Sequence, residues 1–315
     1  MNVLVTGGAG FIGANLCREL LERPEVDRVV ALDDLSTGRA DNLDGTGAEL
    51  VEGSILDAAV LARLVADADA VVHLAARPSV PRSLADPVAS HDVNATGTIR
   101  VLEACRRETV HVVAASSSSV YGSVTSLPKH EGLPTRPLSP YGASKLAAEA
   151  YVLAYGASFG LPSLAFRFFN VYGPLQPAGH AYAAVVPTFV DAAMRGEPLL
   201  VHGDGHQTRD FTFVGTVTWV LADAVLRRVT SDEPVNLAFG TRMSVLELTR
   251  RLSGVLGTPV EVRHGPPRAG DVRDSQAADE RLRRLFPGAT AVPLEEGLRR
   301  TVAWFRGRPV YAAAR

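Results

Sequence analysis

Hydrophobic and polar positions follow two distinct patterns through the first half of the chain. Short, nearly continuous apolar runs rich in β-branched residues indicate buried strands, and longer stretches with three- to four-residue spacing indicate amphipathic helices. The expected strands are residues 3–6, 28–33, 49–52, 70–75, 111–116 and 163–169. The expected helices are residues 11–22, 57–65, 88–107 and 140–159. This alternation predicts an α/β fold of the Rossmann type, a doubly wound parallel sheet with helices on both faces.

The pattern changes near residue 171, where glycine and proline become frequent and the expected helices shorten. We therefore expect a dinucleotide-binding lobe over residues 1–170 and a smaller, discontinuous α/β lobe over residues 171–315 that binds the substrate. Segments 209–216 and 235–238 have strand character and are expected to return to the main sheet. The first lobe would then be rejoined by about residues 210–238.

A glycine-rich turn joins the first expected strand to the first expected helix. Gly7, Gly10 and Gly13 allow a tight turn and a close approach of the backbone to a pyrophosphate at the helix N-terminus. A lone glycine pattern of this kind is often only a turn. Here Asp33 ends the second expected strand, 20 residues after Gly13, where a carboxylate accepts the hydroxyl groups of a ribose. The pattern predicts NAD, because this carboxylate would repel the 2′-phosphate of NADP.

Tyr141 and Lys145 are the candidate proton-transfer pair. Ser139 and Pro140 form a natural helix start, which places Tyr141 and Lys145 one turn apart on the same helix face. An ammonium group nearby favours a phenolate, so we expect the pKa of Tyr141 to fall towards neutrality. An exposed Tyr–Lys helix pair is the ordinary alternative. The hydroxyls of the run Ser116–Ser119 at the end of the fifth strand favour the catalytic interpretation, because open α/β sheets bind ligands at that edge.

Composition and charge limit the partners of this chain. The 315 residues carry 32 basic and 34 acidic side chains, a formal net charge of −2, without a basic stripe. Neither nucleic acid nor an anionic membrane surface is expected as a partner. Two cysteines, Cys17 and Cys105, are too few for a disulfide framework and are expected to be buried thiols. With no leader-like or membrane-spanning run, a soluble cytoplasmic protein without a metal site is expected.

These linked motifs resemble the extended short-chain dehydrogenase/reductase family, in its nucleotide-sugar epimerase/dehydratase branch, and most closely the UDP-glucose and UDP-N-acetylglucosamine 4-epimerases. The resemblance covers the whole chain and implies an isomerase with tightly bound NAD and a homodimer that pairs the helices near residues 92–107 and 141–158. It implies these cofactor contacts: Gly7, Gly10, Phe11, Ile12, Gly13, Asp33, Asp34, Ser36, Thr37, Gly38, Ser54, Ile55, Leu74, Ala75, Ala76, Asn94, Tyr141 and Lys145.

Serines stand where other members of this branch carry acidic residues. Sugar 4,6-dehydratases have Thr-Asp-Glu at positions 117–119, and this chain has Ser117, Ser118 and Ser119. Elimination of water is therefore not expected, whereas Ser117 matches the catalytic Ser/Thr of 4-epimerases. The family's adenine-binding Gly-Asp-Ile becomes Gly-Ser-Ile, with Ser54 in place of the aspartate. Serine still bonds an adenine amine, but the tightness of NAD binding is left open.

The resemblance also implies a clamp for the nucleotide sugar. Its residues are Ser79, Arg82, Ser117, Ser118, Asn170, Val186, Arg209, Arg268, Asp271 and Ser275. Ser275 takes the place of a bulky tyrosine in epimerases restricted to UDP-glucose and UDP-galactose, which leaves room for a 2-acetamido group. The expected reaction is 4-epimerisation of UDP-GlcNAc and UDP-GalNAc, and of the non-acetylated pair. A UDP-glucuronate 4-epimerase, a net dehydrogenase or reductase, a silent NAD-sensing protein, and TDP in place of UDP stay open.

Overall fold

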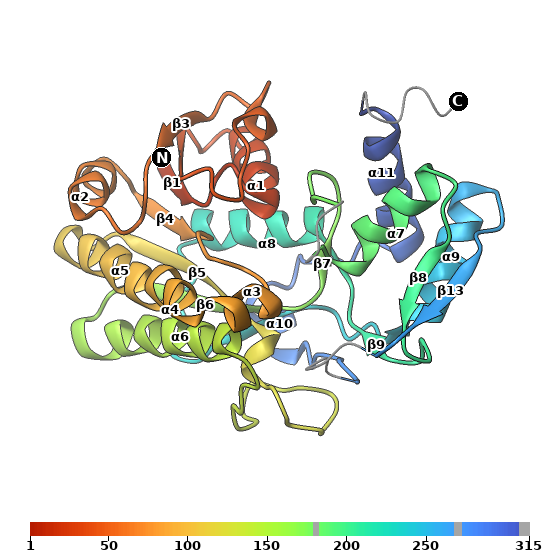
Figure 1. Ribbon diagram of the computed structural model, residues 1–315. Helices are drawn as coiled ribbons and strands as arrows, with labels where there is room; N and C mark the ends of the chain where they lie inside the picture. Colours follow the sequence, from red (N-terminus) through yellow and green to blue (C-terminus); the bar gives the residue numbers. More distant parts are fainter. Residues whose placement is uncertain (179–182, 268–272, 309–315) are drawn as a thin grey trace.

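Seven parallel strands form the central sheet of the computed structural model, which describes residues 1–178, 183–267 and 273–308 (Figure 1). Their order across the sheet is β3-β2-β1-β4-β5-β6-β11, and each neighbouring pair is parallel. The strand bounds are β1 Asn2–Thr6, β2 Arg28–Asp33, β3 Glu49–Glu52, β4 Ala70–His73, β5 His111–Ser117, β6 Ser163–Phe168 and β11 Val235–Leu237. The order reverses beside β1, so the ends of β1 and β4 open a crevice at the switch point.

Helices cover both faces of this sheet, each with its own apolar core. One face packs against α1 (Phe11–Leu21) and α8 (Val214–Leu226), and α10 (Glu280–Leu285) lies near β11 at the edge. The helices on the other face are α2 Ala58–Ala66, α4 Pro87–His91, α5 Gly97–Glu108 and α6 Pro140–Phe159. Short elements complete this part of the chain: η1 Ala40–Leu43, α3 Val80–Ala85, the π-helical turn η2 Asp92–Thr96 and η3 Ser118–Val120. The two buried faces explain why the strands read as continuous apolar runs.

A third apolar core belongs to the second half of the chain and lies beside the main sheet (Figure 1). Its helices are α7 Val185–Met194, α9 Val245–Leu256 and α11 Leu294–Arg306. Its strands pair in twos: β7 Val171–Tyr172 with β10 Thr212–Phe213, β9 Thr208–Arg209 with β12 Met243–Ser244, and β8 Leu199–His202 with β13 Val262–Gly265. The chain crosses between the cores more than once, because α8 and β11 pack on the main sheet.

The predicted fold class is confirmed, and most expected elements match within one or two residues. One expectation is refined and another is wrong. The segment 88–107 is helical throughout, as expected, but a π-helical turn at Asp92–Thr96 lies between α4 and α5. The segment 209–216 does not return to the main sheet, because β9 and β10 pair with β12 and β7, whereas β11 joins β6 as expected. The division into two domains stays a prediction.

Neither thiol in the described chain is exposed: Cys17 and Cys105 are both buried and unpaired, and burial raises the pKa of each to about 12. Within residues 1–178, 183–267 and 273–308, no helix combines the length and apolarity needed to cross a membrane. The same described residues contain no cluster of three or more side chains suited to hold a metal ion.

Candidate active site

A cleft of about 1020 Å³ opens at the carboxyl ends of the central strands. It runs from the end of β2, past the β1–α1 turn, to the ends of β5 and β6 and the start of α6. Among its lining residues are these predicted ones: Gly7, Gly10, Phe11, Ile12, Gly13, Asp33, Asp34, Ser36, Thr37, Ser54, Ile55, Leu74, Ala75, Ala76, Arg82, Ser117, Ser118, Tyr141, Lys145 and Asn170. The structure therefore brings the predicted proton-transfer residues and all but two of the predicted cofactor residues, Gly38 and Asn94, into the lining of one cavity.

The β1–α1 turn leaves no room for side chains where a dinucleotide phosphate would lie. Gly7 has φ +71°, and a Cβ there would lie 2.7 Å from the backbone nitrogen of Ala75. A Cβ at Gly13 would lie 2.1 Å from the carbonyl oxygen of Gly7. The N-cap residue of α1 is Gly10, which has no side chain to cap the N–H groups of the first turn. The first turn also holds no acidic residue. The helix N-terminus is therefore suited to an anionic pyrophosphate, so the site fits NAD.

Asp33 is held at the end of β2 by backbone donors. Its carboxylate accepts hydrogen bonds from the N–H groups of Ala9 at 3.0 Å and Leu35 at 2.9 Å. Burial raises the pKa of Asp33, and these two donors act against that shift. Gly38 does not line the cleft but packs on the carboxylate, because a Cβ there would lie 2.7 Å from Oδ1 of Asp33. The Asp33 carboxylate therefore lies where an acceptor of ribose hydroxyls is expected.

Ser54 and Ile55 line the cleft just after β3. The Ser54 hydroxyl accepts a hydrogen bond from the backbone N–H of Leu56 at 3.1 Å. An oxygen with two lone pairs keeps one acceptor position for an amine. The contact of Ser54 with adenine stays a prediction.

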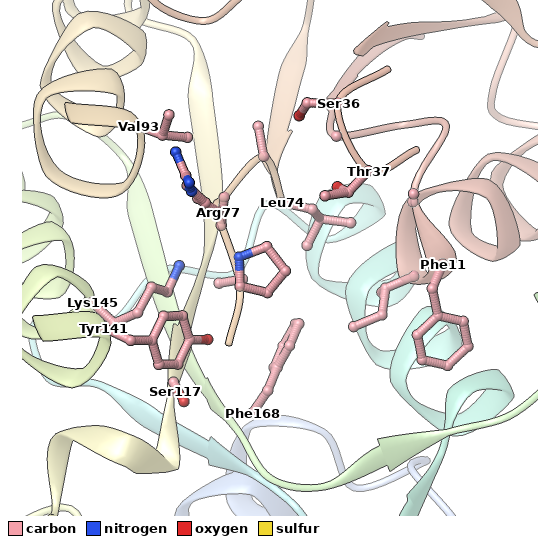
Figure 2. A pocket seen from close by; sticks show the side chains of 18 of the residues that line it. Phe11, Ser36, Thr37, Leu74, Arg77, Val93, Ser117, Tyr141, Lys145 and Phe168 are labelled. Atoms are coloured by element: carbon pink, nitrogen blue, oxygen red, sulfur yellow. The ribbon is translucent and has the colours of Figure 1, made fainter. Parts of the chain in front are cut away.

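Tyr141 and Lys145 lie on α6, one turn apart, as the sequence predicts. Ser139 begins the helix by accepting the Gly142 N–H at 3.1 Å, and Pro140 occupies the first helical position. In Figure 2 the Tyr141 hydroxyl points into the cleft and the Lys145 side chain lies beside its ring. Burial lowers the pKa of Lys145 to about 8, and the charge of Glu149 opposes this shift.

The expected fall in the pKa of Tyr141 is not found. Burial raises the pKa of this phenol, because a phenolate loses its hydration, and a hydrogen bond with Ser117 acts in the opposite direction. Ser117 ends β5, and its hydroxyl also accepts a hydrogen bond from the Ser119 N–H at 3.1 Å. This hydrogen bond holds the hydroxyl at the carboxyl end of the strand. Ser117 therefore partly offsets the effect of burial on the pKa of Tyr141.

A directed hydrogen-bond chain connects the cofactor turn to α6. His73, at the end of β4, lies between Thr6 at 2.7 Å from Nδ1 and Thr98 at 3.0 Å from Nε2. The Thr98 hydroxyl donates to the carbonyl of Asn94 at 2.6 Å, so it accepts from Nε2–H of His73. Burial, and then the charge of Lys145, lowers the pKa of His73 to about 3, so the ring is neutral.

Asn94 continues this chain from the π-helical turn. It accepts the Arg77 N–H at 2.7 Å and donates to the Ser144 hydroxyl at 2.9 Å. Ser144 donates in turn to the carbonyl of Tyr141 at 2.9 Å. Asn94 itself does not line the cleft; it joins the loop after β4 to the helix that carries Tyr141.

Four other predicted substrate residues lie outside the lining of the cleft: Ser79, Val186, Arg209 and Ser275. Ser79 has φ +96° and caps α3, and Val186 is buried in the third core. Arg209 donates to the carbonyls of Thr208 and Arg273, and the Ser275 N–H donates to the Thr208 carbonyl. Arg268 and Asp271 fall outside the described residues.

Sequence reasoning missed several lining residues. Arg77 lies in the loop after β4, and Val93 and Phe168 face the same cavity. Gln176 comes from the chain after β7. Arg77 follows the expected strand 70–75 by two residues. Its position at the carboxyl end of that strand, where open α/β sheets bind ligands, could have indicated a lining residue. The other three lie in segments without a recognisable motif.

The fold and the cleft together define a dinucleotide-binding α/β protein whose ligand site lies at the carboxyl edge of a parallel sheet. The model of the NAD dependent epimerase/dehydratase family matches residues 3–238. The chain belongs to this family. The prediction of an NAD-dependent isomerase is therefore confirmed, with NAD as the cofactor.

Three relatives illustrate the range of this family. A UDP-glucose 4-epimerase of Mycolicibacterium smegmatis is 39% identical over 98% of this chain and 99% of its own. The solved UDP-N-acetylglucosamine 4-epimerase of Methanobrevibacter ruminantium M1, in complex with UDP-N-acetylmuramic acid, is 34% identical, with TM-score 0.91 over 96% of this chain and 97% of its own. The dTDP-glucose 4,6-dehydratase DesIV of Streptomyces venezuelae, with NAD and TYD bound, is 32% identical, with TM-score 0.87 over all of both chains.

Proposed function

We propose that this chain is a 4-epimerase of UDP-hexoses that interconverts UDP-GlcNAc and UDP-GalNAc, and also UDP-Glc and UDP-Gal. The observation that carries the proposal is the distribution of charge in the cleft. Among its described lining residues the carboxylates are Asp33 and Asp34, both at the end of β2. The other end, around Tyr141, offers the hydroxyls of Ser116–Ser119.

This distribution favours epimerisation over elimination of water. A 4,6-dehydratase needs an acid and a base beside the sugar, in addition to the tyrosine, to remove the C5 proton and the C6 hydroxyl. Ser118 and Ser119 occupy the corresponding positions here, and serine hydroxyls titrate far above neutral pH. A 4-keto sugar in this cleft therefore has no described carboxylate to start elimination.

The residues of the chain then act as follows. Tyr141, as phenolate, takes the proton of the C4 hydroxyl, while Ser117 donates a hydrogen bond that stabilises the charged oxygen. Lys145 supplies the ammonium that favours the phenolate. Bound NAD supplies the hydride acceptor and donor at C4. Tyr141 returns its proton after the keto sugar has turned its other face, which inverts C4 without net consumption of cofactor.

Two observations support an acetylated sugar as the substrate. Ser275 is smaller than the tyrosine of epimerases restricted to non-acetylated sugars, and the Methanobrevibacter relative is named a UDP-N-acetylglucosamine 4-epimerase. A second candidate is a UDP-glucuronate 4-epimerase, because Arg77 and Arg82 line the cleft and arginine suits a carboxylate. Arg77 already forms an ion pair with Asp86 at 3.3 Å, which favours the neutral sugar.

Separate incubations with UDP-GlcNAc, UDP-Glc and UDP-GlcA, without added NAD, test this proposal by proton NMR. We expect UDP-GlcNAc to give UDP-GalNAc with no stoichiometric absorbance change at 340 nm. Parallel incubations with added NAD or NADH test for a net dehydrogenase or reductase, which would change the absorbance at 340 nm in proportion to the sugar converted. Conversion of UDP-GlcA alone would overturn the substrate, and no conversion of any sugar, with or without added NAD, would overturn the epimerase.

A further inference from the structure

A buried ion pair lies behind the catalytic lysine. Glu149 stands one helical turn after Lys145 on α6, and its carboxylate forms two hydrogen bonds with Arg167 of β6. Nη2 of Arg167 lies 2.6 Å from Oε1 of Glu149, and Nε lies 2.9 Å from Oε2. Both side chains are 4% exposed. The pair does not line the main cleft, and the proton-transfer step proposed above does not use it.

The pair contacts the strands that carry the cleft residues. The hydroxyl of Ser116 donates to Oε2 of Glu149 at 2.6 Å, and Ser116 directly precedes Ser117 on β5. Arg167 directly precedes Phe168, which lines the cleft from β6. One carboxylate therefore joins β5, β6 and α6 immediately behind the reacting groups.

Arg167 is also supported from its other side. Its guanidinium lies over the ring of Tyr121, 4.7 Å from the centroid, and the Tyr121 hydroxyl donates to Asn236 at 2.7 Å. Burial disfavours the charged guanidinium, but the hydrogen bonds and charge of Glu149 hold the pKa of Arg167 above its ordinary value. The guanidinium is thus held charged against the carboxylate.

Stability alone does not explain such a pair. Two charges lose their hydration when they are buried, and apolar residues of similar size often stabilise a core as well or better. Placement four residues after Lys145 on the same face of α6 instead brings a negative charge to a buried ammonium.

We propose that Glu149, held by Arg167, is a positioning residue that keeps Lys145 charged and fixes Ser117 and Tyr141 relative to each other. Burial lowers the pKa of Lys145 to about 8, and the carboxylate of Glu149 is the charged group that opposes the shift. Removal of this carboxylate lowers the pKa of Lys145 further, so the ammonium that favours the phenolate is lost at a lower pH.

The other charged and titratable groups around Lys145 do not replace Glu149. His73 from β4 is neutral, with a pKa of about 3, and Tyr141 is the phenol that Lys145 serves. On α4 and the π-helical turn, His91 and Asp92 are exposed to solvent. On α5, Glu103 forms an ion pair with Arg106 and accepts the Tyr155 hydroxyl, near the opposite end of α6. From the loop after β4 and from α3, Arg77 and Arg82 add positive charge to the same cleft.

The composition of the chain permits a direct measurement. The sequence contains two lysines, Lys129 and Lys145, so protein labelled with [ε-¹³C]lysine gives two side-chain signals. A Lys129→Arg variant assigns them. The midpoint of the Lys145 signal against pH reports its charge in purified holoenzyme, without substrate.

Glu149→Gln is the test variant, and Glu149→Asp is its matched control with the charge retained. We expect the Lys145 midpoint to fall by about one unit in Glu149→Gln and to return towards the wild-type value in Glu149→Asp. The alkaline limb of the kcat profile should move by the same amount. The protonated fraction would then fall about fivefold at pH 8 and hardly change at pH 6.

A double variant separates charge from stability. Glu149→Gln alone leaves the Arg167 guanidinium buried without its carboxylate and lowers Tm. Glu149→Gln with Arg167→Met removes both charges, and Met can pack on the Tyr121 ring. We expect the double variant to regain Tm and retain the lowered Lys145 midpoint.

A wild-type Lys145 midpoint in Glu149→Gln or in the double variant would overturn the inference. The same conclusion follows if kcat at pH 8 recovers together with Tm in the double variant. The activity readout rests on the proposed function, whereas the lysine titration needs no substrate. Failure of the epimerase proposal is therefore distinguishable from failure of this one.

Discussion

Tyr141, Ser117 and Lys145 line the same end of the cleft, and burial disfavours the charged form of Tyr141 and of Lys145. It raises the pKa of the Tyr141 phenol and lowers that of the Lys145 ammonium to about 8. Two neighbours oppose these shifts: Ser117, through its hydrogen bond to the phenol, and Glu149, through its charge. At the residue scale we therefore expect activity to depend on Ser117 and Glu149, which partly offset the effect of burial on the two pKa values.

Tyr141→Phe removes the proton acceptor and leaves the ring in place. We expect kcat to fall by about 10²- to 10⁴-fold, because a positioned acid or base contributes an acceleration of that size. Steady-state kinetics with UDP-GlcNAc measure the loss. Ser117→Ala, which removes one hydrogen bond to the phenol, should cost less than Tyr141→Phe. An unchanged kcat in Tyr141→Phe would refute the assignment of the base.

Ser54→Asp introduces the family's usual residue at the position that we expect to contact adenine. A charged acceptor forms a stronger hydrogen bond with an amine than a hydroxyl does, and the carboxylate can still accept the Leu56 N–H. We expect NAD to bind about fivefold more tightly, a gain of about 1 kcal/mol. The NAD content of purified protein and its dissociation rate measure the effect, with Ser54→Ala as the control. Weaker retention in Ser54→Asp would show that the residue does not face adenine.

At the scale of elements, α6 is positioned through polar contacts at two places along its length. Asn94 of the π-helical turn bonds Ser144 near its start, and Glu149 bonds β5 and β6 in its middle. The catalytic helix is therefore fixed both to the loop after β4 and to the centre of the sheet.

Asn94→Ala tests the first of these contacts. The substitution leaves the part-buried Arg77 N–H without its acceptor and removes the donor to the Ser144 hydroxyl, which keeps its own hydrogen bond to the Tyr141 carbonyl. We expect a loss of about 2 kcal/mol in the free energy of unfolding and about a tenfold lower kcat, since small displacements of catalytic groups are costly. Urea unfolding and kinetics at saturating UDP-GlcNAc measure both. Ser144→Ala should have a smaller effect on stability, and an Asn94→Ala protein with wild-type kcat would contradict a positioning role.

The helices and strands of the main sheet were predictable because their signals are local. The start of α6 follows from Ser139 and Pro140, and the bounds of β2 follow from its apolar run. The π-helical turn was not predictable, since it depends on how Asn94 meets Arg77 and Ser144 in space. The same holds for the pKa of Tyr141, where burial outweighs a charge that the spacing alone suggested.

The buried networks had weaker signals in the sequence. His73 and Thr98 are 25 residues apart, and Glu149 and Arg167 are 18 apart, so no local pattern joins them. A charged residue four positions after Lys145 on an otherwise apolar face was the one available hint for Glu149.

At the scale of the whole molecule, the cleft lies beside the main sheet, and several predicted substrate residues belong to the neighbouring core. Val186 and Arg209 lie in that second part, outside the lining of the cleft. Ser275 is half-buried beside Thr208. Their roles are predictions about how the two parts hold a nucleotide sugar between them.

Ser275→Tyr tests this arrangement. A tyrosine fills the space that we assign to the 2-acetamido group, so turnover of UDP-GlcNAc should fall at least tenfold relative to UDP-Glc. The ratio of kcat/KM for the two sugars measures the effect, and Ser275→Ala, which keeps the space, should leave the ratio near its wild-type value. Equal losses on both sugars in Ser275→Tyr would reject the pocket.

The central claim is that hydrogen leaves C4 of the sugar and returns to C4. UDP-GlcNAc carrying deuterium at C4 tests it most directly, with the product analysed by NMR and mass spectrometry. We predict UDP-GalNAc with the deuterium retained at C4. Deuterium at C6 of a 4-keto-6-deoxy product would contradict this account, because it would show that elimination follows oxidation in this cleft.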